Sequence, residues 1–133
     1  MKINSTSPCP CDSGQSYKRC CQPLHNSAIP ATPEALMRSR YSAYKLGLVA
    51  YIIATTHPDG AHYQADQTLW QREIQEFCRS TRFERLQVLS AQGDTVVFRA
   101  TLFAGKRDVS FTEISLFRQH EGRWKYHSGK VLP

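Results

Sequence analysis

The pattern of apolar and polar residues changes along the chain from a helical period to a strict alternation. The run Thr32-Pro33-Glu34 is typical of a helix start, with an N-cap threonine, a proline in the first turn and an anion where the helix dipole favours it. After it, apolar residues recur at helical spacing: Met37, Tyr41, Tyr44 and Leu48. The pattern predicts a helix that runs to Gly47, because glycine suits the left-handed position at a helix end.

Two more helices are expected before the alternation begins. A short one covers residues 49–54, and a longer one covers residues 66–80. The longer helix places a set of apolar residues on one side: Trp70, Ile74, Phe77 and Cys78. We therefore expect the fifth cysteine of the chain, Cys78, to be a core residue.

From residue 83 onward, apolar and polar residues alternate, which is typical of strands with one buried face. Four strands are expected, around residues 86–88, 96–102, 109–117 and 124–126. Turn signals separate them by hairpin-length links: Gly93-Asp94, Gly105-Lys106 and Glu121-Gly122. Such links make the sheet antiparallel, and helices followed by a meander predict an α+β fold.

The first 27 residues have a different composition, poor in aliphatic side chains and rich in Cys, Ser, Pro and Asn. A segment of this kind forms no core without a cross-link or a metal. A short linker, residues 26–30, follows it. We therefore expect two parts, residues 1–27 and residues 28–133, with separate cores.

The cysteines of the first part have the chemistry of a structural zinc site. Four thiolates complete a closed tetrahedral shell, and the energy of metal binding becomes folding energy. We assign four ligands to one zinc ion: Cys9, Cys11, Cys20 and Cys21. His25, four residues after Cys21, is a competing fourth ligand. The disulfide interpretation is disfavoured, because a bridge between the adjacent Cys20 and Cys21 would be strained.

The run Cys9-Pro-Cys-Asp-Ser-Gly-Gln-Ser-Tyr-Lys-Arg-Cys-Cys21 resembles the SEC-C motif, the small zinc element also found at the C-terminal tail of the translocation motor SecA. All four cysteines stand at the ligand positions of that motif. Asp12 stands where the motif often has glycine, and Gln15 where lysine is frequent. The resemblance therefore implies a zinc-binding N-terminal segment.

The rest of the chain resembles the bacterial YchJ family, on the segments 32–44, 111–117 and 122–126. The resemblance implies a nuclear transport factor 2-like domain, in which helices form a cone over a curved antiparallel sheet. One departure is Thr112, where relatives often carry a histidine before the glutamate. Any chemistry that depends on that histidine would be absent from this chain.

The net charge of +6 gives little support to a nucleic-acid partner, since the 17 Lys and Arg residues are scattered singly or in pairs. No run approaches the ~18 apolar residues of a membrane span. The N-terminus also lacks the apolar region of a secretory signal. We expect a cytoplasmic protein that does not contact a membrane, in a compartment where thiols stay reduced.

One charged residue, Glu113, falls on an otherwise apolar strand face, next to the hydroxyl of Ser115. The interpretation we favour is that Glu113 pairs with Arg38 or Arg40 and fixes the helix to the sheet. The alternative is a small-molecule pocket in which residues of the first helix are polar partners of the ligand: Arg38, Arg40, Tyr41 and Tyr44.

Four histidines are isolated in the sequence and are expected on loops or the surface: His57, His62, His120 and His127. Without a diagnostic catalytic constellation, we assign no catalytic residue. The function expected first is an interaction module that contacts a protein partner through its zinc segment. A ligand-binding or enzymatic pocket around Glu113 is the alternative, and a nucleic-acid binder comes third.

Overall fold

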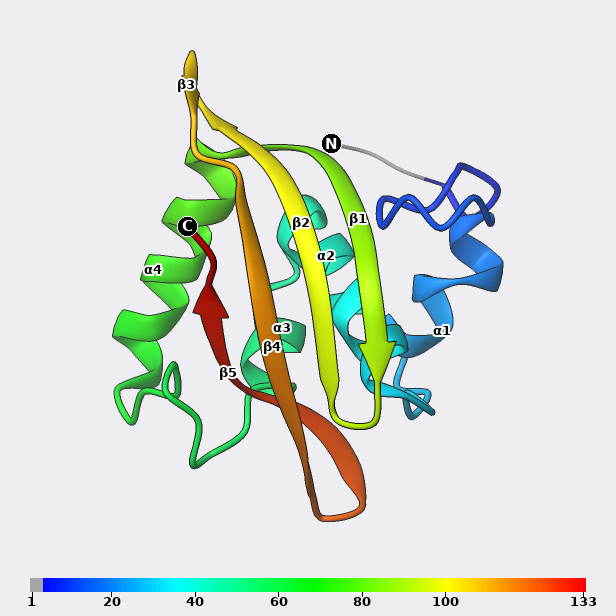
Figure 1. Ribbon diagram of the computed structural model, residues 1–133, viewed down its shortest axis with the longest axis vertical. Coiled ribbons are helices and arrows are strands. Elements are labelled where there is room, and N and C mark those ends of the chain that lie inside the picture. Colours follow the sequence, from blue (N-terminus) through cyan, green and yellow to red (C-terminus); the bar gives the residue numbers. More distant parts are fainter. Residues whose placement is uncertain (1–3) are drawn as a thin grey trace.

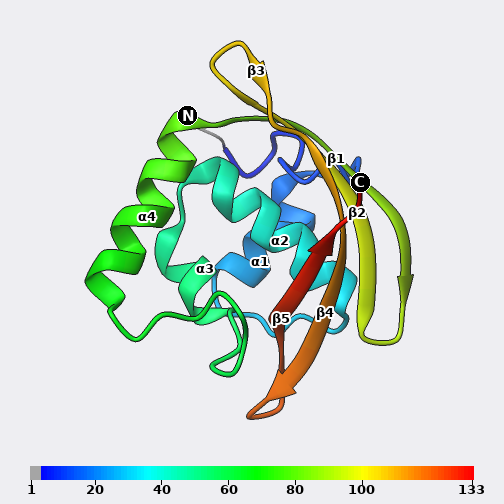
Figure 2. The ribbon, with the colours of Figure 1, turned by 60° about the vertical axis from the view of Figure 1, so that its left-hand side comes forward.

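The computed structural model, which describes residues 4–133, has one curved antiparallel sheet with its longer helices on the concave face (Figures 1 and 2). The sheet consists of β1 Arg82–Gln92, β2 Thr95–Ala104, β3 Arg107–Asp108, β4 Phe111–His120 and β5 Arg123–Val131. Its strands follow the order β1-β2-β4-β5, and β3 pairs only with β2. The expected α+β class is therefore confirmed.

The helices are η1 Tyr17–Arg19, α1 Cys21–His25, α2 Pro33–Leu46, α3 Val49–Ala54 and α4 Gln67–Ser80. The predicted caps of α2 are present, because the Thr32 side chain accepts a hydrogen bond from the Ala35 amide at 3.1 Å. At the other end, Gly47 has a left-handed backbone with φ of 74°. On α4, Trp70 and Ile74 are buried as expected, whereas Phe77 is 40% exposed.

The third expected strand differs from the structure at its beginning. Instead of a continuous strand from residue 109, the chain forms the two-residue β3 and then β4. Between them, the Ser110 hydroxyl accepts a hydrogen bond from the Leu102 amide at 3.0 Å and donates one to its carbonyl at 3.3 Å. A side chain therefore replaces the backbone ladder at this point, which an alternating sequence pattern does not reveal.

The expectation of two separate cores is wrong. Residues from the N-terminal segment, from α2 and from the sheet form one buried cluster, which includes Cys9, Cys11, Tyr17, Cys21, Leu36, Met37, Tyr41, Phe83 and Phe117. Polar contacts add to this packing, since Arg38 of α2 donates to the Cys11 carbonyl at 3.0 Å. The first 27 residues contain too few aliphatics for a core of their own, so they bury their cysteines and Tyr17 against α2.

Asp12 joins the N-terminal segment to the sheet. Its carboxylate accepts a hydrogen bond from the backbone amide of Leu86 at 2.8 Å, although 74 residues separate them. Leu86 lies on β1, which is an edge strand of the sheet. Asp12 also has a positive φ of 62°, a conformation that favours glycine but that Asp tolerates. Asp12 therefore fits a turn that favours glycine and adds an acceptor for an unpaired edge amide.

We predict that Asp12→Ala destabilises the fold by about 1–3 kcal/mol, because the Leu86 amide loses its acceptor and alanine is strained at positive φ. Asp12→Asn should be nearly neutral, since asparagine keeps an acceptor oxygen and tolerates this conformation. Chemical denaturation measures both, with the exposed Asp59→Ala as a surface control. Equal stability of Asp12→Ala and wild type would show that the contact with β1 contributes nothing.

Candidate metal centre and ligand pocket

The structure brings the four clustered cysteines together around one point. The Sγ atoms of Cys9, Cys11, Cys20 and Cys21 all lie within 4.8 Å of one another. Two of the separations are 3.5 Å, between Cys11 and Cys20, and 3.9 Å, between Cys20 and Cys21. In a tetrahedral site with Zn–S bonds near 2.3 Å, sulfur atoms lie about 3.8 Å apart. The four cysteines are therefore placed to hold a metal ion.

Local backbone turns create this arrangement. The first cysteine pair lies in a loop that is closed by hydrogen bonds from the Cys9 amide to the Gln15 carbonyl at 2.9 Å and from the Asp12 amide to the Cys9 carbonyl at 3.1 Å. In the second pair, Cys20 has φ of −123° and ψ of −97° between η1 and α1. This sharp change of direction allows two adjacent cysteines to point at one site.

Hydroxyl groups surround the sulfur atoms. The Ser42 hydroxyl of α2 donates to Cys21 Sγ at 3.3 Å, and Ser13 Oγ lies 3.2 Å from Cys20 Sγ. Hydrogen bonds of this kind orient thiolate ligands and stabilise their charge. Cys20 is the only partly exposed member of the group, and the other three are buried.

Crowding makes it costly to ionise the four thiols together. Hydrogen bonds from Cys11 and Cys21 lower the pKa of Cys9, whereas the hydrogen bonds of Cys21 to Cys11 and Cys9 raise the pKa of Cys21. Burial raises the pKa of Cys20 to about 11. Neighbouring thiols thus share protons, and a bound divalent cation is what allows all four to be thiolates.

His25, the alternative fourth ligand, is engaged elsewhere. Its Nε2 donates to the Ser39 carbonyl at 2.8 Å, which leaves Nδ1 to accept from the Tyr17 hydroxyl at 2.6 Å. Burial also lowers the pKa of His25, in keeping with a neutral ring. Because both ring nitrogens have partners in the protein, the arrangement favours Cys21 over His25 as fourth ligand.

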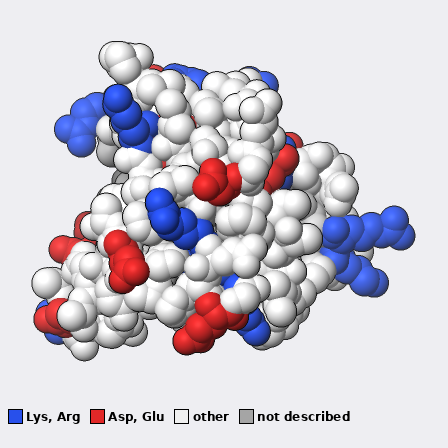
Figure 3. Space-filling model, turned by 60° about the horizontal axis from the view of Figure 1, so that its bottom comes forward, with Lys and Arg blue, Asp and Glu red and all other residues white. Residues whose placement is uncertain are grey.

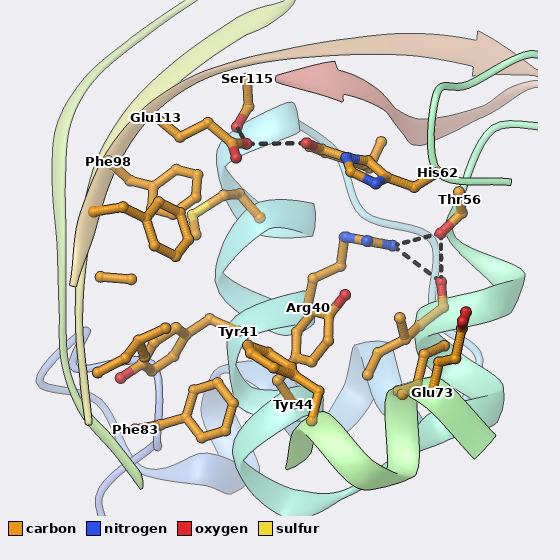
Figure 4. Close-up of a pocket in the computed structure, with 18 of the residues that line it drawn as sticks. Arg40, Tyr41, Tyr44, Thr56, His62, Glu73, Phe83, Phe98, Glu113 and Ser115 are labelled. Carbon is orange, nitrogen blue, oxygen red and sulfur yellow. Dashed lines mark hydrogen bonds between the residues drawn. The ribbon is translucent and has the colours of Figure 1, made fainter. Parts of the chain in front are cut away.

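A second feature is a cavity of about 350 Å³ between the concave sheet face and the helices (Figure 4). Its walls are mostly apolar and aromatic, with contributions from Trp70, Phe83, Phe98 and Phe117. Several polar groups also reach it, among them Arg40, Tyr44, Glu113, Ser115 and Tyr126. Cavities of this size and composition are typical of small-molecule sites.

Glu113 does not fix the helix to the sheet as expected. One carboxylate oxygen, Oε2, accepts hydrogen bonds from Ser115 Oγ at 2.6 Å and from the Tyr126 hydroxyl at 3.0 Å. Arg38 instead pairs with Glu34 at 3.1 Å, and Arg40 donates to groups at the end of α3. Within residues 4–133 neither arginine contacts Glu113, so the helix-anchor interpretation is wrong and the carboxylate belongs to the cavity.

Gly129 of β5 makes room for this carboxylate. A Cβ atom at that position would lie 2.3 Å from Glu113 Oε2 and 2.6 Å from the Tyr126 hydroxyl. Sequence reasoning identified Glu113 and Ser115 but missed Tyr126 and Gly129 as their partners. The available signal was the glycine itself, since glycine within a strand often marks a close approach of another group.

Three of the histidines that are isolated in the sequence lie together in the structure. His57 is only 7% exposed, and its ring centroid is 5.3 Å from those of His120 and His127. The Asp59 amide donates to His57 Nδ1 at 3.0 Å. The fourth, His62, stacks on Tyr126 beside the cavity, with 5.7 Å between the ring centroids. His57 thus lies in a loop, which agrees with the expectation, but it is buried and packs against two other histidines, which the sequence did not indicate.

The surface shows no continuous basic patch on the face drawn in Figure 3, where acidic side chains lie between the basic ones. This agrees with the scattered Lys and Arg residues of the sequence. In the part of the chain that the structure describes, the helices are too short or too polar to cross a membrane.

Comparisons with known proteins match both parts of the chain. Residues 6–23 match the SEC-C motif, and residues 32–129 match the family described as YchJ, middle NTF2-like domain. A UPF0225 protein of Deinococcus radiodurans is 40% identical over 90% of this chain and 85% of its own length. The chain belongs to the YchJ family. A UPF0225 protein of Sodalis glossinidius is also similar, at 41% identity over 95% of this chain and 84% of its own length.

Solved structures agree with this membership of the YchJ family. The solution structure of a SEC-C motif containing protein from Rhodopseudomonas palustris has 36% identity and a TM-score of 0.77, and covers 94% of this chain and 98% of its own. A crystal structure of a SEC-C motif containing protein from Psychrobacter arcticus has 25% identity and a TM-score of 0.62, over 97% and 82% of the two chains. The resemblance seen in the sequence is therefore confirmed.

Proposed function

We propose that this YchJ-family chain binds a small molecule in the cavity under its sheet, and that a zinc ion at the four cysteines holds the domain together. The observation that carries the proposal is the carboxylate of Glu113, held by two hydroxyl groups in an otherwise mostly apolar cavity of about 350 Å³. A charged group maintained in such a place at a cost in desolvation is typical of a binding site.

Zinc is the metal that best suits the cysteine site. Four sulfur ligands at tetrahedral spacing are the donor set of structural zinc centres, and a closed shell leaves no position for substrate. The cytoplasm is part of the proposal, because thiols stay reduced there and remain available to the metal. The zinc ion would supply folding energy, and the chemistry of recognition would lie in the cavity.

Helix α2 connects the two sites. Ser42 contacts the cysteine sulfurs and Arg38 the Cys11 carbonyl, whereas Arg40 and Tyr44 line the cavity. The metal centre thus supports one side of the helix whose other side forms a wall of the cavity. A structural zinc would in this way fix the shape of the ligand site without touching the ligand.

The hydrogen bonds of the Glu113 carboxylate support ligand binding better than catalysis. Burial and the neighbouring carboxylate raise the pKa of Tyr126, so its hydroxyl keeps its proton and donates to Glu113. Two fixed donors occupy one carboxylate oxygen and leave Oε1 for a donor on the ligand. These groups can therefore bind a ligand without a further acid or base.

A protein partner of the cysteine segment is the second candidate function. The observation that favours it is an open groove of about 440 Å³ beside Cys20, lined by residues of both the segment and α2 that include Arg19, Glu34 and Arg38. Capture of one protein by the tagged wild-type chain, lost with Arg19→Glu but not with pocket variants, would support this role.

We predict one zinc ion per chain, retained in His25→Ala and in Cys78→Ser and lost in Cys11→Ser. Elemental analysis of the purified variants measures it. Because Cys9, Cys11 and Cys21 share a buried cluster with α2 and the sheet, chelation should lower the stability of the whole chain in a single unfolding transition. A sheet that melts at an unchanged temperature after metal removal would contradict this coupling.

Glu113→Gln should leave the melting temperature unchanged or raise it. The glutamine oxygen can still accept from Ser115 or Tyr126, and the desolvation cost of a carboxylate disappears. A helix anchor would instead lose about 1–3 kcal/mol on the same substitution. Thermal melting beside wild type distinguishes the two, and a clearly destabilised variant would count against a ligand-binding role for Glu113.

The cavity itself is tested with phenylpropanol, a neutral probe with an apolar body. Titration into the isotope-labelled protein should shift the amide signals of residues that line the cavity, and Ala100→Phe should abolish these shifts by filling it. Ala100 is 2% exposed and lines the cavity, so the larger ring has space to enter. Shifts spread over the surface, or unaffected by Ala100→Phe, would refute binding in the cavity.

A further inference from the structure

Arg40 is a buried cation that has no anionic partner among the residues that the structure describes. Its residue is 8% exposed. The hydrogen bonds found for its guanidinium come from Nη1, to the Ile52 carbonyl at 3.0 Å, Thr55 Oγ1 at 2.8 Å and Thr56 Oγ1 at 3.2 Å. No carboxylate of residues 4–133 lies within ion-pair distance of it, and within these residues Nε and Nη2 form no hydrogen bond of ordinary geometry, although the Tyr44 hydroxyl lies beside the guanidinium. Half of the guanidinium fork is therefore available in the cavity.

The groups around Arg40 hold its guanidinium in position to bind a ligand. Its Cζ lies 4.8 Å from the ring centroid of Tyr126, which holds the guanidinium by a cation–π contact. From the other side, the hydroxyl of Tyr44 points toward the guanidinium (Figure 4). All three residues line the cavity. Three neutral acceptors and the ring of Tyr126 thus hold the cation in place and leave its charge uncompensated.

A buried charge without a counter-ion is costly, and the guanidinium fork matches a carboxylate with two parallel hydrogen bonds. The polarity reverses at the far end of the Tyr126 ring, where its hydroxyl donates to Glu113. One tyrosine therefore separates a positive end of the cavity from a negative end. A ligand that binds at both ends would carry an anionic group that accepts hydrogen bonds from Arg40 and, at its other end, a hydrogen-bond donor for Glu113.

Resting on the proposed function, we propose that the ligand is a small carboxylic acid with an apolar body and a hydrogen-bond donor at its far end. Its carboxylate binds Nε and Nη2 of Arg40 with the Tyr44 hydroxyl, and its donor group binds the free Oε1 of Glu113. A dianion such as a phosphate monoester is disfavoured, because Glu73 also lines the cavity and the two carboxylates outnumber Arg40 there.

Four probes with one phenylpropyl body test this assignment by calorimetric titration: phenylpropanoate, phenylpropanol, phenylpropylammonium and para-hydroxyphenylpropanoate. The acid should bind about tenfold or more tightly than the alcohol, and the ammonium most weakly, because the charged head meets Arg40. The para-hydroxyl group should strengthen binding further by donating to Glu113, and Glu113→Gln should weaken that gain.

Arg40→Gln and Tyr44→Phe should reduce the preference for acid over alcohol, and the exposed Arg118→Gln on β4 serves as a matched control that leaves it unchanged. Tyr44→Phe decides the question if Arg40→Gln does not fold, since within residues 4–133 the Tyr44 hydroxyl forms no hydrogen bond to another helix or strand. A preference retained in Tyr44→Phe, or in a folded Arg40→Gln, would overturn the assignment.

The proposed function and this assignment fail in different ways. Equal affinity of the wild type for acid and alcohol would overturn the anion site but leave ligand binding in the cavity standing. Failure of all four probes to bind would overturn both. Tightest binding by the ammonium probe would reverse the polarity and make Glu113 the charged anchor.

Discussion

The crowding of four thiols at one point is the constraint on which the rest of this structure depends. Their sulfur atoms lie within 4.8 Å of one another, and their pKa values diverge because they share protons. A divalent cation would resolve this conflict and let a segment poor in aliphatic residues become part of a core. Since the same cysteines pack against α2, whose other residues line the cavity, the cysteine site and the cavity share one helix.

Opposite charges in the cavity are kept apart instead of being paired. Arg40 donates hydrogen bonds to three neutral acceptors at the end of α3, and Glu113 accepts hydrogen bonds from two hydroxyl groups of the sheet. A direct ion pair between them would satisfy both groups and close the site to a polar ligand. The two charges stay available because Tyr126 lies between them, with its ring under Arg40 and its hydroxyl on Glu113.

Local signals in the sequence were sufficient to predict α2, its two caps, the alternation of β2 and β4, and the four cysteines, because each depends on residues close in the chain. The partners of Glu113 were not predictable in this way. Gly129 is opposite Ser115 only because of the register between β4 and β5. Likewise Arg40 reaches the carbonyl of Ile52 through the turn between α2 and α3, and His57 meets His120 and His127 through the tertiary fold.

Thr112, at which this chain departs from the pattern of the family, lies on β4 next to Glu113. Adjacent residues of a strand point to opposite faces, so the side chain of Thr112 leaves the sheet on the face away from Glu113. There its hydroxyl accepts a hydrogen bond from Arg99 Nη1 at 3.4 Å. A histidine at residue 112 would therefore stand on the convex face and could not reach the cavity. The identity of residue 112 therefore leaves the lining of the cavity unchanged.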